Sequence, residues 1–210
     1  MTTFESCFHK VGSISLPAFS GTRVMMLPLV LGDLSSVPPN LSAWKETLSR
    51  LFDMGGHVGE VGYLTIDEKQ VKAGATHRRA GAHVDGIYQG KAGPWGGGGW
   101  GSAGNGMLTV SSVAGCRAWA GQFSGWPGFE GECDHLLEQA EGETVFDAGE
   151  VYWVDGLCVH ESLPMQADTP RQFVRLSLPS NAPWFEGYTE NPLGVMPTGA
   201  ILPRRTFMDS

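Results

Sequence analysis

The sequence has few cysteines and no long apolar run, and each shortage excludes a class of protein. Its four cysteines, at positions 7, 116, 133 and 158, include no C-x-x-C pair and no dense disulfide spacing. We therefore expect a reduced, cytoplasmic protein. The longest apolar run covers residues 24–31, contains Pro28 and is far too short to span a bilayer, so we expect no membrane partner.

Basic residues are also scarce. The chain has 14 Lys and Arg against 22 Asp and Glu, a net charge of −8. This balance argues against a nucleic-acid backbone as the main partner, because surfaces that bind one carry excess positive charge. A local basic site stays open, with Arg78 and Arg79 as one candidate. No basic, apolar and small-residue order opens the chain and Glu5 comes early, so we expect no secretory signal.

The composition predicts one globular domain over residues 1–210. The hydrophobic fraction of 41% and the charged fraction of 17% are typical of a folded chain long enough for one buried core. Thirty Gly and thirteen Pro indicate many short strands and turns. We expect either one or two strands or an irregular leader over 1–39, a Gly-rich loop over 90–106 and a surface wrap over 180–210.

One stretch predicts a helix, from about residue 41 to residue 54. Its apolar residues recur at steps of three and four and form one stripe, which favours packing against the outside of a sheet. Asn40 or Ser42 would cap its start, and Gly55-Gly56 would end it.

Short patterns of period two predict a mostly β fold. We expect Asp67 to Gln70 to be a turn or an exposed end, and Asp155-Gly156 to join its two flanking strands in a tight hairpin. Many short strands and one outer helix favour a jelly roll. The expected strands are residues 61–66, 107–113, 117–123, 151–154, 157–160 and 172–178.

The Gly-rich loop lacks the Lys-Ser/Thr ending of a phosphate-binding loop, so it is not interpreted as one. It is either a mobile surface connection or a lid that brings Trp95 or Trp100 over a substrate.

The segment from Ala82 to Tyr88 carries the clearest chemistry. His83 and Asp85 are two residues apart and point the same way in an extended segment, so both can reach one metal ion. His160 supplies a second imidazole. Two His and one carboxylate with open coordination positions describe the facial triad of non-haem Fe(II) oxygenases.

Two arginines follow His160 on a predicted strand. Arg171, Arg175 and Ser177 share one parity, and this row faces inward if the His160 face does. Buried arginines are costly without an anion, and Arg binds a carboxylate in a planar two-pronged geometry. A dicarboxylate cosubstrate would supply that anion.

Together these residues resemble the Fe(II)/2-oxoglutarate-dependent dioxygenases over roughly residues 60–180. The run from His160 through Glu-Ser-Leu-Pro to Arg171 is most similar to the prolyl-hydroxylase-like branch. Arg175-Leu-Ser177 resembles the Arg-x-Ser pair of the penicillin-synthase-like branch, and arginines at both distances also resemble taurine dioxygenase. The family fold is a double-stranded β-helix, in agreement with the strand pattern.

The resemblance implies that His83, Asp85 and His160 hold Fe(II), with 2-oxoglutarate and O2 as cosubstrates and ascorbate as a stimulant. Spacing favours Arg171 for the distal carboxylate of 2-oxoglutarate, and leaves Arg175 for its C1 carboxylate or for the substrate. Related halogenases have a small residue in place of the carboxylate, so Asp85 favours hydroxylation. The implied reaction hydroxylates a small polar molecule or a peptide side chain and releases succinate and CO2.

Several alternatives stay open. One alternative is a non-enzymatic jelly-roll module that binds its ligand through tryptophans. Another is a cupin-like metalloenzyme that does not use 2-oxoglutarate. Taken alone, Arg171 and Arg175 would be solvated strand residues paired with Glu161 or Asp168. We expect His57, His77 and His135 to be structural or surface residues, and Cys158 to be a small buried residue rather than a thiol beside the metal. Nothing in the sequence indicates the primary substrate or the oligomeric state.

Overall fold

The computed structural model describes residues 3–85, 106–128, 131–179 and 184–202, and antiparallel strands dominate it. The Gly-rich loop apart from Gly106, with Trp95 and Trp100, lies outside the described residues, as do residues 180–183 and 203–210 of the expected wrap. The strands are β1 (Thr3–Ser6), β2 (Phe8–Ser13), β3 (Arg23–Val30), β4 (Val61–Val71), β5 (Met107–Ser111), β6 (Cys116–Trp119), β7 (Gly121–Ser124), β8 (Thr144–Val145), β9 (Glu150–Val154), β10 (Val159–Ser162), β11 (Thr169–Ser177), β12 (Trp184–Phe185) and β13 (Ile201–Leu202).

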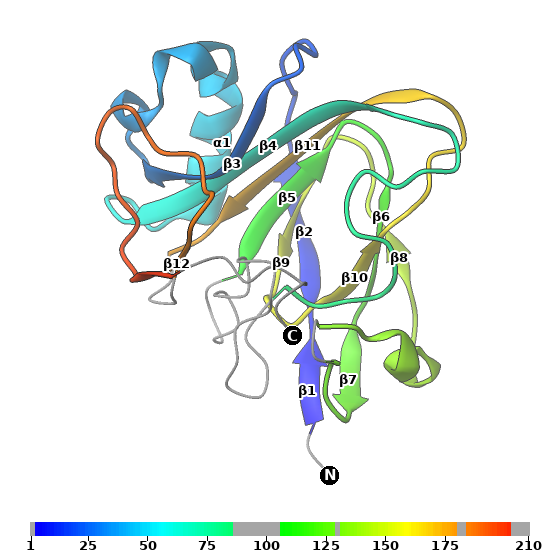
Figure 1. Cartoon of the computed structure of the whole chain (residues 1–210). Coiled ribbons are helices and arrows are strands. Elements are labelled where there is room, and N and C mark those ends of the chain that lie inside the picture. The colour runs from blue at the N-terminus through cyan, green and yellow to red at the C-terminus, as the bar shows by residue number, and fades with distance from the viewer. Residues whose placement is uncertain (1–2, 86–105, 129–130, 180–183, 203–210) are drawn as a thin grey trace.

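Six of these strands form the main sheet, in the order β2-β9-β5-β11-β4-β3. Its central strands are buried on both faces because a helix covers one face and the candidate site lies on the other. Figure 1 shows α1 (Lys45–Gly55) against the side of β3 and β4. The outer face contributes Leu64, Ile66, Leu108, Val110, Val174 and Leu176, which pack with Leu48, Leu51 and Phe52 of α1 in one core cluster.

The expected helix forms on the outside of the sheet, but it starts later than predicted. Pro39–Trp44 is a 3-10 helix, and α1 follows it with Trp44 at its N-cap and no side-chain cap. The predicted caps Asn40 and Ser42 are therefore wrong, because their segment winds as the tighter helix. The predicted end is confirmed: Gly56 adopts φ +66°, a conformation that glycine takes without steric cost.

The leader contains three strands, not one or two, because β1, β2 and β3 all find partners far along the chain. β1 pairs with β7, β2 with β9, and β3 with β4. Two 3-10 helices complete the irregular parts, Leu34–Ser36 before α1 and Asp134–Gln139 after β7.

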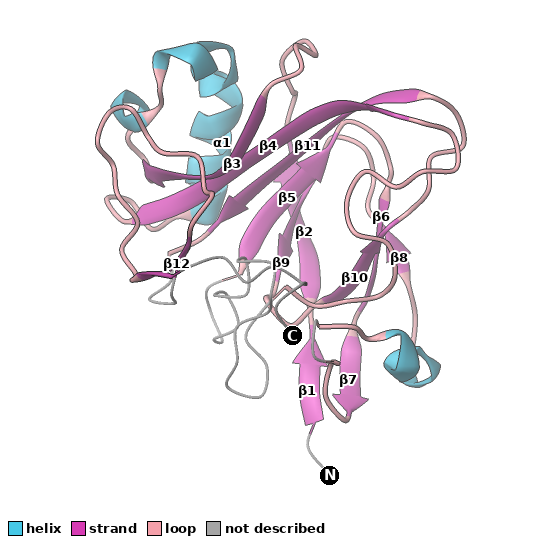
Figure 2. Ribbon diagram, viewed as in Figure 1, coloured by secondary structure: helices cyan, strands magenta, loops and turns pink. Residues whose placement is uncertain are grey.

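The predicted hairpin around Asp155-Gly156 is wrong. β9 pairs with β2 and β5 in the main sheet, whereas β10 pairs with β6 in a separate three-stranded sheet of order β10-β6-β8. The turn is real, since Leu157 N donates to Asp155 Oδ1 at 2.7 Å, but it carries the chain from one sheet to the other. Figure 2 shows this small sheet well separated from α1.

The predicted turn at Asp67 to Gln70 is also wrong. β4 continues to Val71, and every residue from Thr65 to Val71 pairs with β11. Asp67 and Glu68 are buried, because partners from distant segments satisfy both carboxylates.

The described chain is therefore a mostly β, antiparallel fold compatible with a jelly roll, as the sequence predicts. None of the helices in the described part of the chain has both the length and the apolar character needed to cross a membrane.

Candidate metal centre

His83, Asp85 and His160 meet at one point of the fold. One potential ligand atom from each residue lies within 4.8 Å of the other two. His160 Nε2 is 3.8 Å from Asp85 Oδ2, and the two imidazole ring centres are 4.5 Å apart. Among the described residues, this is the group of His, Cys, Asp and Glu side chains arranged to hold one ion.

Backbone pairing brings the two histidines together. His83 N donates to the carbonyl of His160 and His160 N donates to the carbonyl of His83, both at 2.9 Å. On its other side the 82–84 segment bonds with residues 131–133, through Val84 N to Gly131 O and Cys133 N to Ala82 O. The segment from His83 to Asp85, called the HxD segment below, thus extends the small sheet beside β10. The side chains of His83 and His160 therefore lie on the same face of that sheet.

Both imidazoles are oriented through their second nitrogen. His83 Nδ1 lies 2.7 Å from the carbonyl of Gly81, and His160 Nδ1 lies 2.9 Å from the carbonyl of Cys158. A carbonyl only accepts, so each Nδ1 donates a proton to it and each Nε2 is the nitrogen left to face a metal. Burial lowers the pKa of His83 to about 4, so this ring is neutral at pH 7. A neutral, oriented imidazole is the form in which histidine binds a metal.

Asp85 is ionised and held by Arg175. Arg175 Nη1 donates to Asp85 Oδ2 at 2.8 Å, across from the HxD segment to β11. Burial opposes ionisation of Asp85, but the charge of Arg175 holds the pKa of its carboxyl well below the usual range. The three side chains therefore offer two imidazole nitrogens and one carboxylate, a donor set that fits a divalent iron with open positions.

Arg171 is the second inward arginine, and its side chain is 1% exposed. Its Nε donates to Ser111 Oγ at 2.9 Å and one Nη approaches Ser162 Oγ at 3.4 Å. No carboxylate lies within ion-pair distance of it among the described residues. Its close neighbour is Gly115, where a Cβ would lie 2.8 Å from the guanidinium carbon.

The alternative of solvated arginines paired with Glu161 or Asp168 is wrong. Glu161 pairs with Arg117, and Asp168 pairs with Lys72. The inward row predicted for β11 is confirmed, since Arg171, Arg175 and Ser177 are all buried. The Ser177 hydroxyl has no hydrogen-bond partner among the described residues.

A β-bulge in β3 places Met26 against Arg175. The β3–β4 register shifts between Val24 and Leu27, and Met26 takes φ +57°, rare for a residue other than glycine. Its sulfur lies 3.3 Å from Arg175 Nη2 and 3.2 Å from Thr65 Oγ1. The bulge thus turns a thioether into the inner face beside the arginine that holds Asp85.

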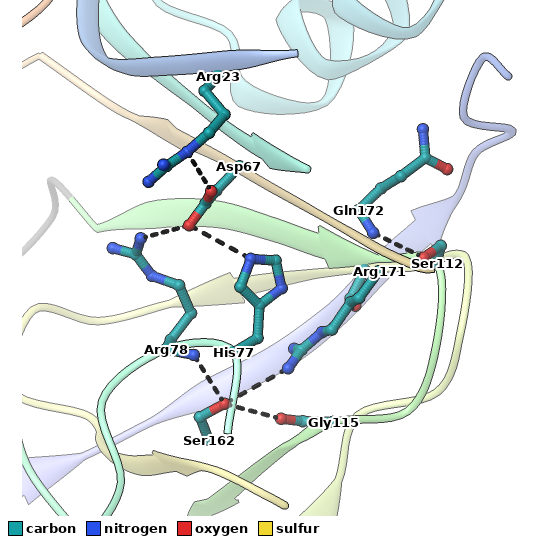
Figure 3. Close-up of polar contacts among 10 residues, drawn as sticks. Arg23, Asp67, His77, Arg78, Ser112, Gly115, Ser162, Arg171 and Gln172 are labelled. Atoms are coloured by element: carbon teal, nitrogen blue, oxygen red, sulfur yellow. Dashed lines mark hydrogen bonds and ion pairs between the residues drawn. The ribbon is translucent and has the colours of Figure 1, made fainter. Parts of the chain in front are cut away.

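A second buried carboxylate, Asp67, lies on the same face of the main sheet. Arg23 Nε and Arg78 Nη1 donate to its two oxygens, each at 3.0 Å, and His77 Nε2 lies 3.2 Å from Oδ2 (Figure 3). Arg78 N also donates to Ser162 Oγ, the hydroxyl that Arg171 approaches. Figure 3 shows the resulting continuous polar network from β3 to Arg171. Through it, the residues that precede the HxD segment are bonded to the main sheet.

The other histidines and Cys158 lie in surface or buried structural positions, as the sequence predicts. His57 and His135 are exposed, His77 is buried beside Asp67, and Cys158 is fully buried among apolar residues with its thiol pKa raised by burial. Sequence reasoning missed Met26, Asp67, Ser111 and Ser162. Asp67 had a detectable signal, because it shares strand parity with Tyr63 and Thr65, whereas nothing local marks the bulge at Met26.

Comparison with known proteins adds little to this picture. No family model matches the chain, and no curated protein matches it in sequence. Among solved structures, the apo form of ThoJ, a non-heme monooxygenase, superposes with a TM-score of 0.41 at 16% identity, over 84% of this chain and 75% of that one. We therefore infer function from the site itself.

Proposed function

We propose that this chain is an Fe(II)/2-oxoglutarate-dependent dioxygenase that hydroxylates a small polar molecule or a peptide side chain. The observation that carries the proposal is the convergence of His83, Asp85 and His160, with one ligand atom from each inside 4.8 Å. Two buried arginines on the facing strand β11 add the cations that a dicarboxylate cosubstrate needs.

His83 and His160 would hold the metal through Nε2, and Asp85 through its carboxylate. Fe(II) held there would supply the oxidation of 2-oxoglutarate by dioxygen to succinate and CO2, with the second oxygen atom inserted into a substrate C–H bond. The protein contributes fixed ligands, charge compensation and exclusion of water. Arg175 keeps Asp85 oriented by its 2.8 Å hydrogen bond, and the Gly81 and Cys158 carbonyls keep the rings in one tautomer.

Arg171 is the better anchor for the distal carboxylate of 2-oxoglutarate. Arg175 is already engaged by Asp85, whereas Arg171 is buried with hydroxyl partners and no carboxylate. The cavity that Arg171 lines has a volume of about 10 Å³, room for one water. Binding of the carboxylate therefore requires a neighbour to move, and the flexible Met165, whose Cε also faces Gly115, is suited to this.

Succinate formation tests the proposal. The purified protein with Fe(II), ascorbate and 2-oxoglutarate should form succinate slowly without any primary substrate. His160→Ala and Asp85→Ala should each abolish this turnover, and His135→Ala, which changes an exposed histidine, should leave it unaltered. Normal turnover in either ligand variant would count decisively against the assignment.

A further inference from the structure

The inner face around the metal ligands carries more positive than negative charge. The guanidinium groups of Arg78, Arg171 and Arg175 lie there with the carboxylates of Asp67 and Asp85. The surplus contrasts with the chain as a whole, which has a net charge of −8. A cationic face in an acidic protein concentrates anions at that point.

The surplus of positive charge on this face remains when the metal and 2-oxoglutarate are counted. A divalent metal and dianionic 2-oxoglutarate cancel one another, so three guanidinium groups still face two carboxylates. Arg171 and Arg175 have assigned contacts, on the distal carboxylate and on Asp85. Of these three cations, Arg78 is the one without such a contact.

Arg78 is built as a fixed and partly open donor. Its Nη1 binds Asp67 Oδ2 at 3.0 Å, and its guanidinium carbon lies 5.4 Å from the centre of the Phe173 ring. The side chain is nevertheless 30% exposed, and its Nε and Nη2 have no partner among the described residues. A guanidinium has five N–H donors, so most of them are available to a ligand.

Asp67 does not neutralise Arg78 completely. The same carboxylate binds Arg23 through its other oxygen and lies 3.2 Å from His77. Arg78 is also tied to the strand that carries a metal ligand, since its backbone N donates to Ser162 Oγ at 3.3 Å and Ser162 lies two residues from His160 on β10. Arg78 is thus fixed near the candidate metal centre.

We infer that the primary substrate carries an oxyanion, a carboxylate or a phosphate, which Arg78 binds beside the metal centre. This inference rests on the proposed function for its mechanism, but the anion site itself requires neither the metal nor turnover. A charged hydrogen bond from a planar guanidinium fixes the orientation as well as the position of such a group. The substrate C–H bond would then be held at a set distance from the ligands.

Anion binding to the metal-free protein tests the inference, with inorganic phosphate and acetate as probes in calorimetric titrations. Metal-free protein excludes coordination of the anion to an ion, and the Arg171 site contributes equally to every variant. We expect Arg78→Gln to weaken binding of at least one probe about tenfold, the loss of one charged hydrogen bond. The probe that responds distinguishes a carboxylate from a phosphate substrate.

Arg23→Gln is the matched control. Arg23 also binds Asp67 at 3.0 Å, through its other oxygen, but its side chain is 62% exposed, so its loss should change affinity less than twofold. Equal effects of the two variants, or none from Arg78→Gln with either probe, would overturn the inference. If Arg78→Gln fails to fold, the same titrations are made with Arg78→Lys. In addition, selenate soaked into wild-type crystals should bind against Arg78, and its absence there would overturn the inference.

The outcomes also separate the two proposals. Anion binding at Arg78 together with absence of succinate formation would leave the site and refute the oxygenase. Succinate formation without an Arg78-dependent anion would leave the oxygenase and refute an anionic substrate.

Discussion

His83 and His160, 77 positions apart in the sequence, lie directly opposite one another and exchange both of their backbone hydrogen bonds, each at 2.9 Å. The two imidazoles are therefore placed by sheet pairing and not by flexible side chains. A site built on paired strands holds its ligands more tightly than one built on loops.

The two buried arginines should affect different steps. Arg171→Gln should raise the KM for 2-oxoglutarate about 10- to 100-fold, because a charged hydrogen bond to the distal carboxylate is lost, with little change in Mn(II) affinity. Arg175→Gln should instead lower Mn(II) affinity about tenfold, because Asp85 loses its orienting partner. Steady-state kinetics and Mn(II) electron paramagnetic resonance measure the two effects. The reverse pattern would make Arg175 the cosubstrate anchor.

Gly115 should matter because it leaves space for Arg171. A Cβ at this position would lie 2.8 Å from the Arg171 guanidinium carbon and 2.9 Å from Met165 Cε. Gly115→Ala should therefore raise the KM for 2-oxoglutarate and cost about 1–3 kcal/mol of stability, typical of an overpacked interior. Gly142→Ala is the control, since a Cβ there meets nothing within 4 Å. Unchanged kinetics in Gly115→Ala would contradict the role given to Arg171.

The bulge residue Met26 offers a test of backbone strain. Its φ of +57° is costly for any side chain and most costly for a β-branched one. Met26→Leu should cost less than about 1.5 kcal/mol, as volume-conserving swaps do. Met26→Val should cost about 1–3 kcal/mol more. Urea unfolding of both variants measures this, and equal stabilities would argue against the left-handed backbone.

His77 should make stability depend on pH. Burial lowers its pKa below 6.5, with Arg171 and Lys69 acting in the same direction and Asp67 opposing them. The unfolded chain then binds a proton that the folded chain does not, so stability falls as pH falls below about 6.5. Asp67 stays ionised in both states across this window, because its folded pKa is lowered further below its ordinary value.

The matched variant for this effect is His77→Gln. Between pH 7 and 5 its free energy of unfolding should fall less steeply than that of the wild type, as measured by urea titrations at several pH values. Identical slopes in the two proteins would show that His77 is protonated equally in the folded and unfolded states.

The sequence predicts the local features of the site well. The HxD spacing, the distant His160 and the shared parity of Arg171 and Arg175 are properties of short extended segments, and period two places such side chains correctly. The α1 stripe and its glycine end are local in the same sense.

The errors are non-local. Asp155-Gly156 carries a strong hairpin signal, yet each flanking strand gains more by pairing in a different sheet. The charged run after Ile66 resembles an exposed turn, because burial of Asp67 depends on Arg23 and Arg78, which arrive from other segments. The bulge at Met26 depends on the register of β3 against β4, which no short pattern specifies.

The central claim is that His83, Asp85 and His160 hold one Fe(II) that chelates 2-oxoglutarate. An anaerobic titration of the protein with Fe(II) and then 2-oxoglutarate tests it most directly, by the weak visible charge-transfer band of the chelate. We predict a band that saturates at one iron per chain and is lost in His160→Ala. Absence of the band in the wild type, or an equal band in His160→Ala, would contradict the assignment.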